Sequence, residues 1–359
     1  MRSTLFVGGL GLLVAHAVAA LSQSAAPWRD PSRHQVRLIT VESSVQLEVL
    51  DWGGSGRPVV LLGCYLTAHV YDEFAPKLAN QFHVYGITRR GIGASDHPSR
   101  GYELQLSADD VLEVIDSLKL QKPILVANSC GGWVQTLLAA QHSDRLGGLV
   151  YLDAADDPTL TLADYKFPPV DTAHLPKSAK PPPAPDYSSF EAYRIAQRRD
   201  HGVAFPEAEL RQEFVAKPDG SMGPFLLSPT VRKAIVEDTR VKPDYAHVRV
   251  PVLAVFRTPP PFEEAAKDFI VGNDEERAAL RGRLDAGRVM ISKWENDLRA
   301  GVPTAHIVEL PGANLYMFLS NEADVLREIR AFAATLTARA TAPFFNYLTR
   351  CECAEEILV

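Results

Sequence analysis

Cysteine is scarce in this chain, and no spacing typical of a metal site is present. The four cysteines are Cys64, Cys130, Cys351 and Cys353. The last two form a lone C-x-C without partnering histidines, which is a weak signal compared with the paired spacings of structural zinc sites. We therefore expect no metal, no cofactor, and a C-terminal tail that is exposed or forms a disulfide.

Long blocks of one charge are also missing. The formal net charge is -7, and charged residues make up 23% of the 359 residues. A chain without such a block is not typical of proteins that bind nucleic acid or an anionic membrane surface. The hydrophobic fraction of 46% is instead typical of a globular protein with a full core. We expect a small molecule as substrate or ligand, and the sequence does not indicate an oligomeric state.

The apolar run at the N-terminus is shorter than a typical membrane span. It covers 16 residues from Leu5 to Ala20, whereas a spanning helix needs roughly 20. Arg2 precedes the run and several alanines follow it, as in a cleaved signal peptide. We therefore expect a signal peptide at 1–26 and an exported protein, periplasmic or extracellular, without a stable membrane span after cleavage.

The rest of the sequence alternates short, β-branched apolar runs with helical patterns. This alternation predicts an α/β fold with a parallel sheet covered by helices, preceded by a hairpin. Ser107 is expected to cap one of the helices. We expect strands at 36–41, 45–52, 58–62, 83–88, 124–127, 149–152, 252–256 and 305–310, and helices at 70–80, 107–118, 132–142, 276–298 and 321–336.

A proline-rich stretch, KSAKPPPAP at 177–185, interrupts this pattern. Proline lacks a backbone N–H and fixes φ, so this stretch cannot be a regular helix or a central strand. The interruption predicts a lid insertion at 158–245. The insertion separates two parts of the core, 27–157 and 246–343, and a peripheral tail follows at 344–359.

Ser129 lies in a strand-serine-helix turn of the form A-x-S-x-G, from Ala127 to Gly131. Small residues on both sides of a serine allow a tight turn that exposes the hydroxyl above the sheet, as in a nucleophile elbow. The N-terminus of the following helix would favour a developing oxyanion. The alternative is that Ser129 merely caps the helix that begins beside it.

With these motifs, the chain resembles the α/β-hydrolase superfamily over nearly all of its length after the signal. RRGIGASD at 89–96 is similar to the family's glycine-rich loop after the fourth strand. PGANLYMFLSNEADVLREIRAF at 311–332 is similar to its last loop and helix. The resemblance implies an eight-stranded, mostly parallel sheet flanked by helices. It also implies a serine after strand five, an acid after strand six or seven, and a histidine after strand eight.

The resemblance assigns the acid to Asp153, at the end of the sixth strand, ahead of Asp156 and Glu263. It also implies an oxyanion hole formed by the N–H of Cys130 and one from the loop after strand three. Either Cys64 or Tyr65 could donate there, and the register favours Tyr65.

The family's strand order puts strand three beside strand five. Cys64 and Cys130 should therefore be neighbours, close enough that a disulfide is possible.

The histidine is where the sequence departs from the family. Leu315 stands at the position of the missing base, and leucine cannot accept a proton. His69 is the possible alternative base, although it could simply begin a helix. We therefore expect a serine hydrolase of a small ester or related acyl compound. The alternatives are a catalytically impaired protein that binds a small apolar ligand, and non-hydrolytic chemistry such as that of a lyase or a cofactor-free oxygenase.

Overall fold

The computed structural model describes residues 28–42, 44–179 and 184–341. The expected signal peptide at 1–26 and the expected tail at 344–359 lie outside these residues. Residues 28–31 are irregular and belong to a separate N-terminal unit. The unit that begins at Ser32 contains the sheet and all the helices and strands described below.

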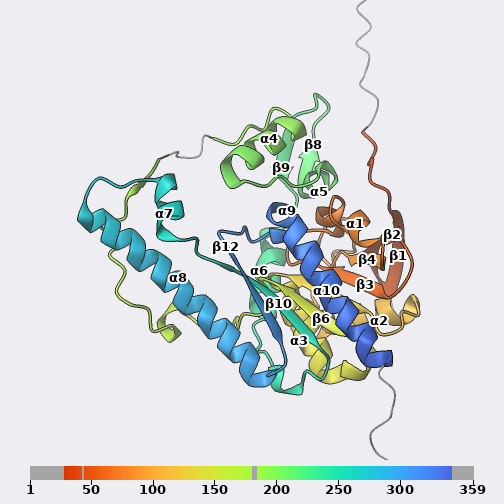
Figure 1. The fold of residues 1–359 in the computed structure, drawn as a ribbon. Helices are drawn as coiled ribbons and strands as arrows, with labels where there is room; N and C mark the ends of the chain where they lie inside the picture. Colours follow the sequence, from red (N-terminus) through yellow and green to blue (C-terminus); the bar gives the residue numbers. More distant parts are fainter. Residues whose placement is uncertain (1–27, 43, 180–183, 342–359) are drawn as a thin grey trace, which may run out of the picture. The chain divides into compact units, whose positions relative to one another are not determined.

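An eight-stranded sheet forms the centre of this unit (Figure 1). Its order is β1-β2-β4-β3-β5-β6-β10-β12. The β1–β2 and β2–β4 pairs are antiparallel, and all pairs from β4–β3 onward are parallel. The strands are β1 (Gln35–Val41), β2 (Val45–Gly53), β3 (Pro58–Leu62), β4 (His83–Ile87), β5 (Ile124–Asn128), β6 (Gly148–Leu152), β10 (Val252–Thr258) and β12 (His306–Pro311). The expected strands and the hairpin are thus confirmed.

Helices cover both faces of the sheet, because the central strands are apolar on both sides. One face packs against α2 (Leu104–Ser117), α3 (Gly131–His142) and the second half of α8 (Asp274–Gly301). The other face packs against α1 (Ala75–Leu78), α9 (Met317–Ser320) and α10 (Glu322–Thr341). Figure 1 shows α10 lying along the strands on this second face. β5 and β6 are buried at every position.

Two expected helices differ from the structure. The helix expected at 70–80 is divided into a 3-10 turn, η1 (Ala68–Tyr71), and α1. Pro76 explains the division, because proline lacks an N–H and clashes with the carbonyl four residues before it in a continuous helix. The second helix, α2, begins at Leu104 with Glu103 as its N-cap. Ser107 therefore lies inside α2, and the prediction that it caps this helix was wrong.

Residues 158–245, here called the inserted segment, connect β6 to β10. Their described part contains α4 (Phe190–His201), α5 (Glu207–Glu213), the hairpin β8 (Phe214–Ala216) and β9 (Met222–Phe225), and α6 (Pro229–Asp238). Shorter elements are η3 (Leu162–Asp164), η4 (Tyr245–His247) and β7 (Lys177–Ser178), which pairs with β11 (Phe269–Ile270). After β10 come α7 (Phe262–Ala265) and η5 (Ala266–Asp268), and η2 (Ser143–Arg145) follows α3.

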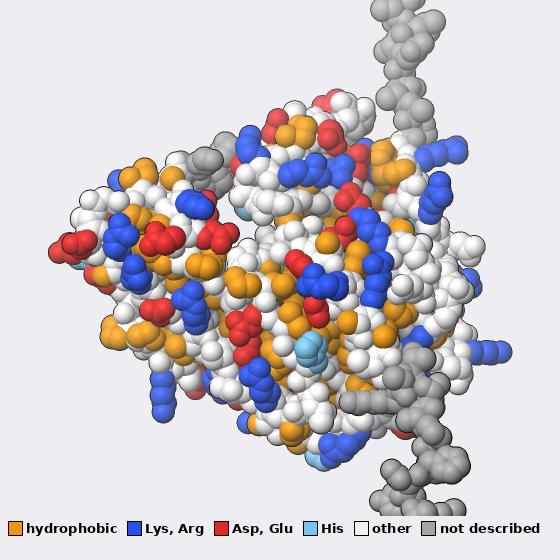
Figure 2. Space-filling view, viewed as in Figure 1, with side chains coloured by type: hydrophobic (Ala, Val, Ile, Leu, Met, Phe, Trp, Pro, Cys, Tyr) orange, Lys and Arg blue, Asp and Glu red, His pale blue; other side chains and the backbone are white. Residues whose placement is uncertain are grey.

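The inserted segment has a small apolar core of its own. Phe190, Leu210 and Met222 are buried together, so α4, α5 and β9 pack against one another. Figure 1 shows these elements grouped beyond α9 and α1. On the face drawn in Figure 2, side chains of both charge signs are interspersed. None of the helices among the described residues is long and apolar enough to cross a bilayer.

Candidate active site at the carboxyl end of the sheet

Ser129 occupies the sharp turn between β5 and α3. Its φ is +53°, a left-handed conformation that is strained for a residue with a side chain. Its carbonyl accepts a hydrogen bond of 2.9 Å from the N–H of Gly132. The residue that caps α3 is Cys130, and it does so without a side-chain hydrogen bond. Ser129 is therefore not the residue that caps α3, and it lies in a strained strand-to-helix turn, which is the geometry expected of a nucleophile elbow.

Two glycines make this turn possible. A Cβ atom on Gly132 would lie 1.9 Å from the carbonyl oxygen of Ala154. A Cβ atom on Gly131 would lie 2.9 Å from the carbonyl oxygen of Gly63. The start of α3 therefore packs directly against the backbone of the segments that follow β6 and β3. This packing brings the helix N-terminus, and its partial positive charge, into the site.

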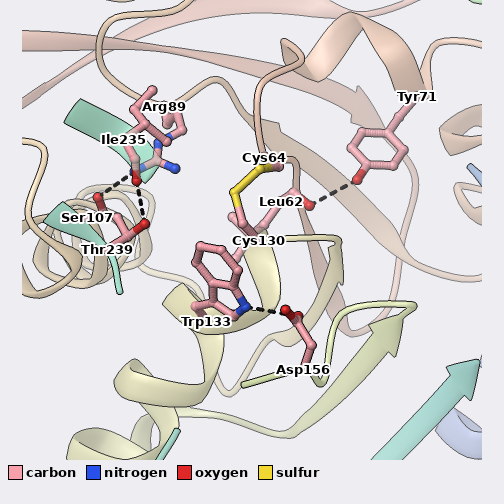
Figure 3. The surroundings of a disulfide bond; sticks show 10 residues. All are labelled: Leu62, Cys64, Tyr71, Arg89, Ser107, Cys130, Trp133, Asp156, Ile235 and Thr239. Atoms are coloured by element: carbon pink, nitrogen blue, oxygen red, sulfur yellow. Dashed lines mark hydrogen bonds between the residues drawn. A yellow bond between two sulfur atoms is a disulfide. The ribbon is translucent and has the colours of Figure 1, made fainter. Parts of the chain in front are cut away.

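A disulfide joins the elbow to the loop after β3 (Figure 3). The Cα atoms of Cys64 and Cys130 are 4.9 Å apart, which confirms that the two residues are neighbours. Both cysteines are buried. The hydroxyl of Tyr71 donates a 2.9 Å hydrogen bond to the carbonyl of Leu62, which fixes the start of the same loop. The disulfide thus holds the loop that contains Cys64 against Cys130, the residue that follows Ser129.

Asp153 follows β6 directly and is buried, with a φ of +50°. Its Oδ2 lies 2.5 Å from Nε of Arg257, and its Oδ1 accepts a 3.3 Å hydrogen bond from the Arg257 N–H. Burial raises the pKa of Asp153, although Arg257 opposes the rise. The acid therefore lies at the expected edge of the sheet, with an arginine as its charged partner.

The other two acids considered for this role have different surroundings. Asp156 accepts a 2.9 Å hydrogen bond from the indole N–H of Trp133, and burial raises its pKa. Glu263 is exposed on α7. Asp153 follows β6, which is the neighbour of β5, the strand that leads into Ser129. Asp153 therefore remains the preferred candidate for the acid over Asp156 and Glu263.

Leu315 lies in the loop between β12 and α9. The side-chain amide of Asn128 donates a 2.9 Å hydrogen bond to the carbonyl of Leu315, and another of 2.9 Å to the carbonyl of Leu152. Because Asn128 immediately precedes Ser129, this loop reaches the elbow. The side chain at the position expected for a base is thus an aliphatic one on a well-anchored loop.

His69 is buried in η1 between two carboxylates. Its Nδ1 lies 3.0 Å from Oδ2 of Asp72, and its Nε2 lies 3.5 Å from Oε1 of Glu48. Burial disfavours the charged ring, but the hydrogen bonds to these acids outweigh it and raise the pKa of His69 to about 10. His69 is therefore a cation at neutral pH. The structure does not support it as the alternative base.

Two glutamates on α5 were not anticipated from the sequence. Glu209 is fully buried and accepts hydrogen bonds from the N–H and the hydroxyl of Thr67, at 3.0 and 2.5 Å. Burial, with a contribution from the nearby Glu213, raises the pKa of Glu209 well above its usual value. Burial also raises the pKa of Glu213 to about 7.

These glutamates lie near both loops of the site. Thr67 follows the loop that contains Cys64, and the charges of Glu209 and Glu213 act on the hydroxyl of Tyr316. Burial is the main reason that the pKa of Tyr316 rises to about 12. Because 142 residues separate Thr67 from Glu209, no local sequence pattern could have revealed this contact.

The residues around Ser129 suit acyl chemistry better than metal chemistry. Within the described ranges, no group of three histidine, cysteine or carboxylate side chains converges on Ser129 as a metal site would require. The features that meet at Ser129 are its strained backbone, the N-terminus of α3 and the loop that Asn128 holds through the carbonyl of Leu315.

Comparison with known proteins agrees with this architecture. The chain is 36% identical over 122 residues to the AB hydrolase superfamily protein YisY of Bacillus subtilis (strain 168), an alignment that covers 33% of this chain and 44% of the relative. It is 34% identical over 116 residues to a soluble epoxide hydrolase of Corynebacterium sp. (strain C12), covering 32% and 40%. The chain thus aligns with less than half the length of these curated relatives.

Solved structures share the fold over most of the chain. E-2-(acetamidomethylene)succinate hydrolase has a TM-score of 0.57 at 20% identity, covering 84% of this chain and 99% of that one. A marine microorganism esterase has a TM-score of 0.53 at 19% identity, covering 80% and 100%. The model of the alpha/beta hydrolase family matches residues 53–328. The chain therefore belongs to the alpha/beta hydrolase family.

Proposed function

We propose that this protein hydrolyses a small ester or a related acyl compound, with Ser129 as the nucleophile. The observation that carries the proposal is the positive φ of Ser129 at the start of α3. A protein maintains such strain at a single residue only where the surrounding structure compensates for it, and such positions cluster at active sites. Relatives named as an epoxide hydrolase and a carbamate hydrolase support hydrolytic chemistry.

In this proposal, Oγ of Ser129 attacks the acyl carbon and the alcohol leaves, which forms an acyl-enzyme that water then hydrolyses. The N–H of Cys130 and that of Tyr65, or of Cys64, stabilise the oxyanion. The disulfide supports this assignment because it joins the two segments that supply these donors. Donors that are fixed before the reaction need no reorganisation when charge develops.

The serine proton needs an acceptor other than His69, the alternative base expected from the sequence. Leu315 cannot accept it, His69 is already protonated at neutral pH, and Asp153 is paired with Arg257. We propose Glu213 for this task, because its charge acts on the hydroxyl of Tyr316, next to Leu315, and burial raises its pKa to about 7. A lone carboxylate is a weaker base than a histidine supported by an acid, so we expect slow turnover.

We further propose that the inserted segment acts as the lid of the site. Two contacts of the segment support this role. Glu209 binds Thr67 after β3, and the ring of Phe205 lies 4.8 Å from that of Tyr316, next to Leu315. The segment therefore contacts both loops that adjoin Ser129, as a cover over a substrate pocket would.

We also propose that the protein is exported. The disulfide supports this proposal, because disulfides persist in oxidising compartments and are rare in the reducing cytosol. Intact mass of the protein recovered after expression with its full sequence tests the proposal. Cleavage between residues 17 and 27 is the expected result, and retention of the first 21 residues would contradict it.

A fluorophosphonate probe tests the nucleophile. The purified protein should be labelled at Ser129, as located by peptide mass spectrometry, and the Ser129→Ala variant should not be labelled. Ser107 provides an internal control and should stay unlabelled, because it is a buried serine whose hydroxyl accepts a hydrogen bond from Arg89. Absence of label at Ser129 in a folded sample would overturn the proposal and favour a ligand-binding protein.

A further inference from the structure

We propose that the substrate carries a carboxylate, and that Arg89 and Arg232 bind this carboxylate beside Tyr65. The inference rests on the proposed hydrolase function, since it names the class of substrate for the same site. It does not depend on which group accepts the serine proton.

Arg89 differs from its neighbour Arg90 in how its charge is balanced. Arg90 is buried and donates two hydrogen bonds, of 2.7 and 2.6 Å, to the carboxylate of Asp110. Arg89 donates one of 3.0 Å to the neutral hydroxyl of Ser107, and its Nε is buried without a partner. A largely desolvated cation that forms no ion pair is unfavourable, although the nearby charge of Asp110 offsets part of the cost, and an anionic ligand would relieve the rest.

Burial lowers the pKa of Arg89 to about 10. The guanidinium is therefore still charged at neutral pH. A planar cation with an unused donor is suited to a carboxylate, because both groups present paired hydrogen-bonding atoms.

Arg232 approaches the same place from the inserted segment. This residue is on α6, and its Cζ lies 5.6 Å from the centre of the Tyr65 ring. The charges of Arg89, Arg232 and Arg240 all act on the Tyr65 hydroxyl and oppose the rise in its pKa that burial causes. Within the part of the chain that the structure describes, none of these three arginines forms an ion pair with a carboxylate.

A short path through the disulfide connects Tyr65, which lies near these arginines, to Ser129. Tyr65 adjoins Cys64, which is bonded to Cys130, and Cys130 adjoins Ser129. Arg89 lines a cavity of about 20 Å³ that Gly63, Gly131, Ser107 and Asp110 also line, and the Asp110 carboxylate there is already hydrogen-bonded to Arg90. Figure 3 shows Arg89 in the surroundings of the disulfide, together with Ile235 and Thr239 at the end of α6.

The size of the cavity limits what can enter it. About 20 Å³ accommodates one water-sized group, such as one carboxylate oxygen. We place the second oxygen on the side of Tyr65 and Arg232, which contact each other there. Because Tyr65 follows the half-cystine that is bonded to the residue after Ser129, the substrate we infer has its carboxylate a few bonds from the scissile carbonyl, as in a half-ester of a short dicarboxylic acid.

Two p-nitrophenyl esters test the inference: neutral p-nitrophenyl acetate and the anionic mono-p-nitrophenyl ester of succinate. We expect kcat/KM to be at least about tenfold higher for the anionic ester, and the preference to weaken in high salt because salt screens exposed charges. Arg232→Gln should reduce the ratio of the two kcat/KM values about tenfold, mainly through the KM of the anionic ester. Arg89→Gln should act in the same direction.

Lys233→Gln is the matched control, because Lys233 is exposed on the same helix and pairs with Glu237 at 3.0 Å. It removes the same charge and should leave the ratio unchanged. Equal ratios for Arg232→Gln and Lys233→Gln, or a wild-type protein that hydrolyses both esters without preferring the anionic one, would overturn the inference. Arg232 is exposed, so its variant tests the inference even if Arg89→Gln does not fold.

A binding measurement separates this inference from the proposed hydrolysis. If neither ester is hydrolysed and the fluorophosphonate does not label Ser129, the proposed function fails. Titration calorimetry of monoethyl succinate against the Ser129→Ala variant then decides the inference alone. Binding that Arg232→Gln weakens about tenfold would support the carboxylate site, and no binding would contradict it.

Discussion

Arg257 is the charged partner of Asp153: its Nε lies 2.5 Å from the Asp153 carboxylate, at the carboxyl ends of the adjacent strands β10 and β6. In a serine hydrolase triad, the corresponding carboxylate orients a histidine and stabilises its charged form. In this protein the side chain hydrogen-bonded to the carboxylate is an arginine instead, and arginine keeps its proton at all ordinary pH values. The chain thus has Leu315 where the family resemblance implies a histidine, and it has an arginine as the partner of the buried acid.

We predict that restoring a histidine at position 315 requires the removal of Arg257. Leu315→His alone should raise the kcat for p-nitrophenyl acetate less than threefold, because Asp153 remains paired with Arg257. Leu315→His combined with Arg257→Gln should raise it by at least about tenfold, since the carboxylate can then orient the imidazole. Stopped-flow or steady-state assays of the single and double variants measure the gain.

The further change Asp153→Asn in the double variant is the control. It should remove most of the gain, because an amide cannot stabilise the charged imidazole. A large gain from Leu315→His alone would show that Arg257 does not compete for the acid. Brisk turnover by the unmodified protein would show that it already contains an effective base.

The disulfide should stabilise both the fold and the oxyanion hole. It closes a loop with a sequence separation of 66 residues, for which the loss of unfolded-state entropy is worth at most about 4 kcal/mol. We expect the Cys64→Ser, Cys130→Ser double variant to lose about 2 to 4 kcal/mol of unfolding free energy in urea. Its kcat on esters should also fall about tenfold, because the two oxyanion donors are no longer held together.

Dithiothreitol provides the matched comparison for this prediction. It should destabilise the wild-type protein and have no further effect on the double serine variant. A double variant with wild-type kcat would mean that the loop keeps its position without the bond.

His69 should make stability depend on pH above neutrality. Its pKa is raised to about 10 in the folded protein, against an ordinary value of 6.5. The stabilisation by Asp72 and Glu48 is therefore fully present below pH 6.5 and is lost as the pH rises through 10. Breaking a buried pair costs about 3 kcal/mol or more, so His69→Gln should be less stable by about that amount at pH 6.

Thermal denaturation of both proteins from pH 6 to pH 10 checks this prediction. The difference in stability between wild type and His69→Gln should narrow towards pH 10. His97→Gln is the control, since His97 is exposed and contacts only a backbone carbonyl. A difference that stays constant with pH would contradict the assignment of His69 as a buried cation.

Glu213 should determine the acid side of the pH profile. As a proton acceptor with a pKa of about 7, it must be ionised, so ester kcat should rise as the pH increases through 7. Glu213→Gln should lower kcat about a hundredfold and remove this rise. Glu207→Gln is the control on the same helix, because Glu207 pairs with Arg211 at 2.6 Å. Persistence of the rise in Glu213→Gln would assign it to another group.

The sheet and the elbow could be predicted from the sequence because their signals are local. Continuous apolar strands such as β5 are recognisable in isolation, and so is the A-x-S-x-G turn around Ser129. The proximity of Cys64 and Cys130 required only the strand order in addition. The break in the helix at 70–80 was also local, and Pro76 was its overlooked signal.

The electrostatic partners could not be predicted in the same way. Arg257 contacts Asp153, which is 104 residues away in the sequence, and Glu209 binds Thr67, which is 142 residues away. Whether a buried charge is compensated depends on which side chains the fold brings within about 3 Å, and hydrophobic periodicity carries no information about that distance. His69 illustrates the consequence, since its closeness in sequence to the loop after β3 suggested a base where the structure has a cation.

The two hydrogen bonds from Asn128 have a consequence for how this position can change over evolutionary time. The amide holds the loop at Leu315 through its main-chain carbonyl, so this hydrogen bond is available whichever side chain residue 315 carries. A substitution at 315 therefore leaves this contact between the loop and the elbow in place. A lineage can exchange an aliphatic residue for an imidazole there while the scaffold around the serine stays in place.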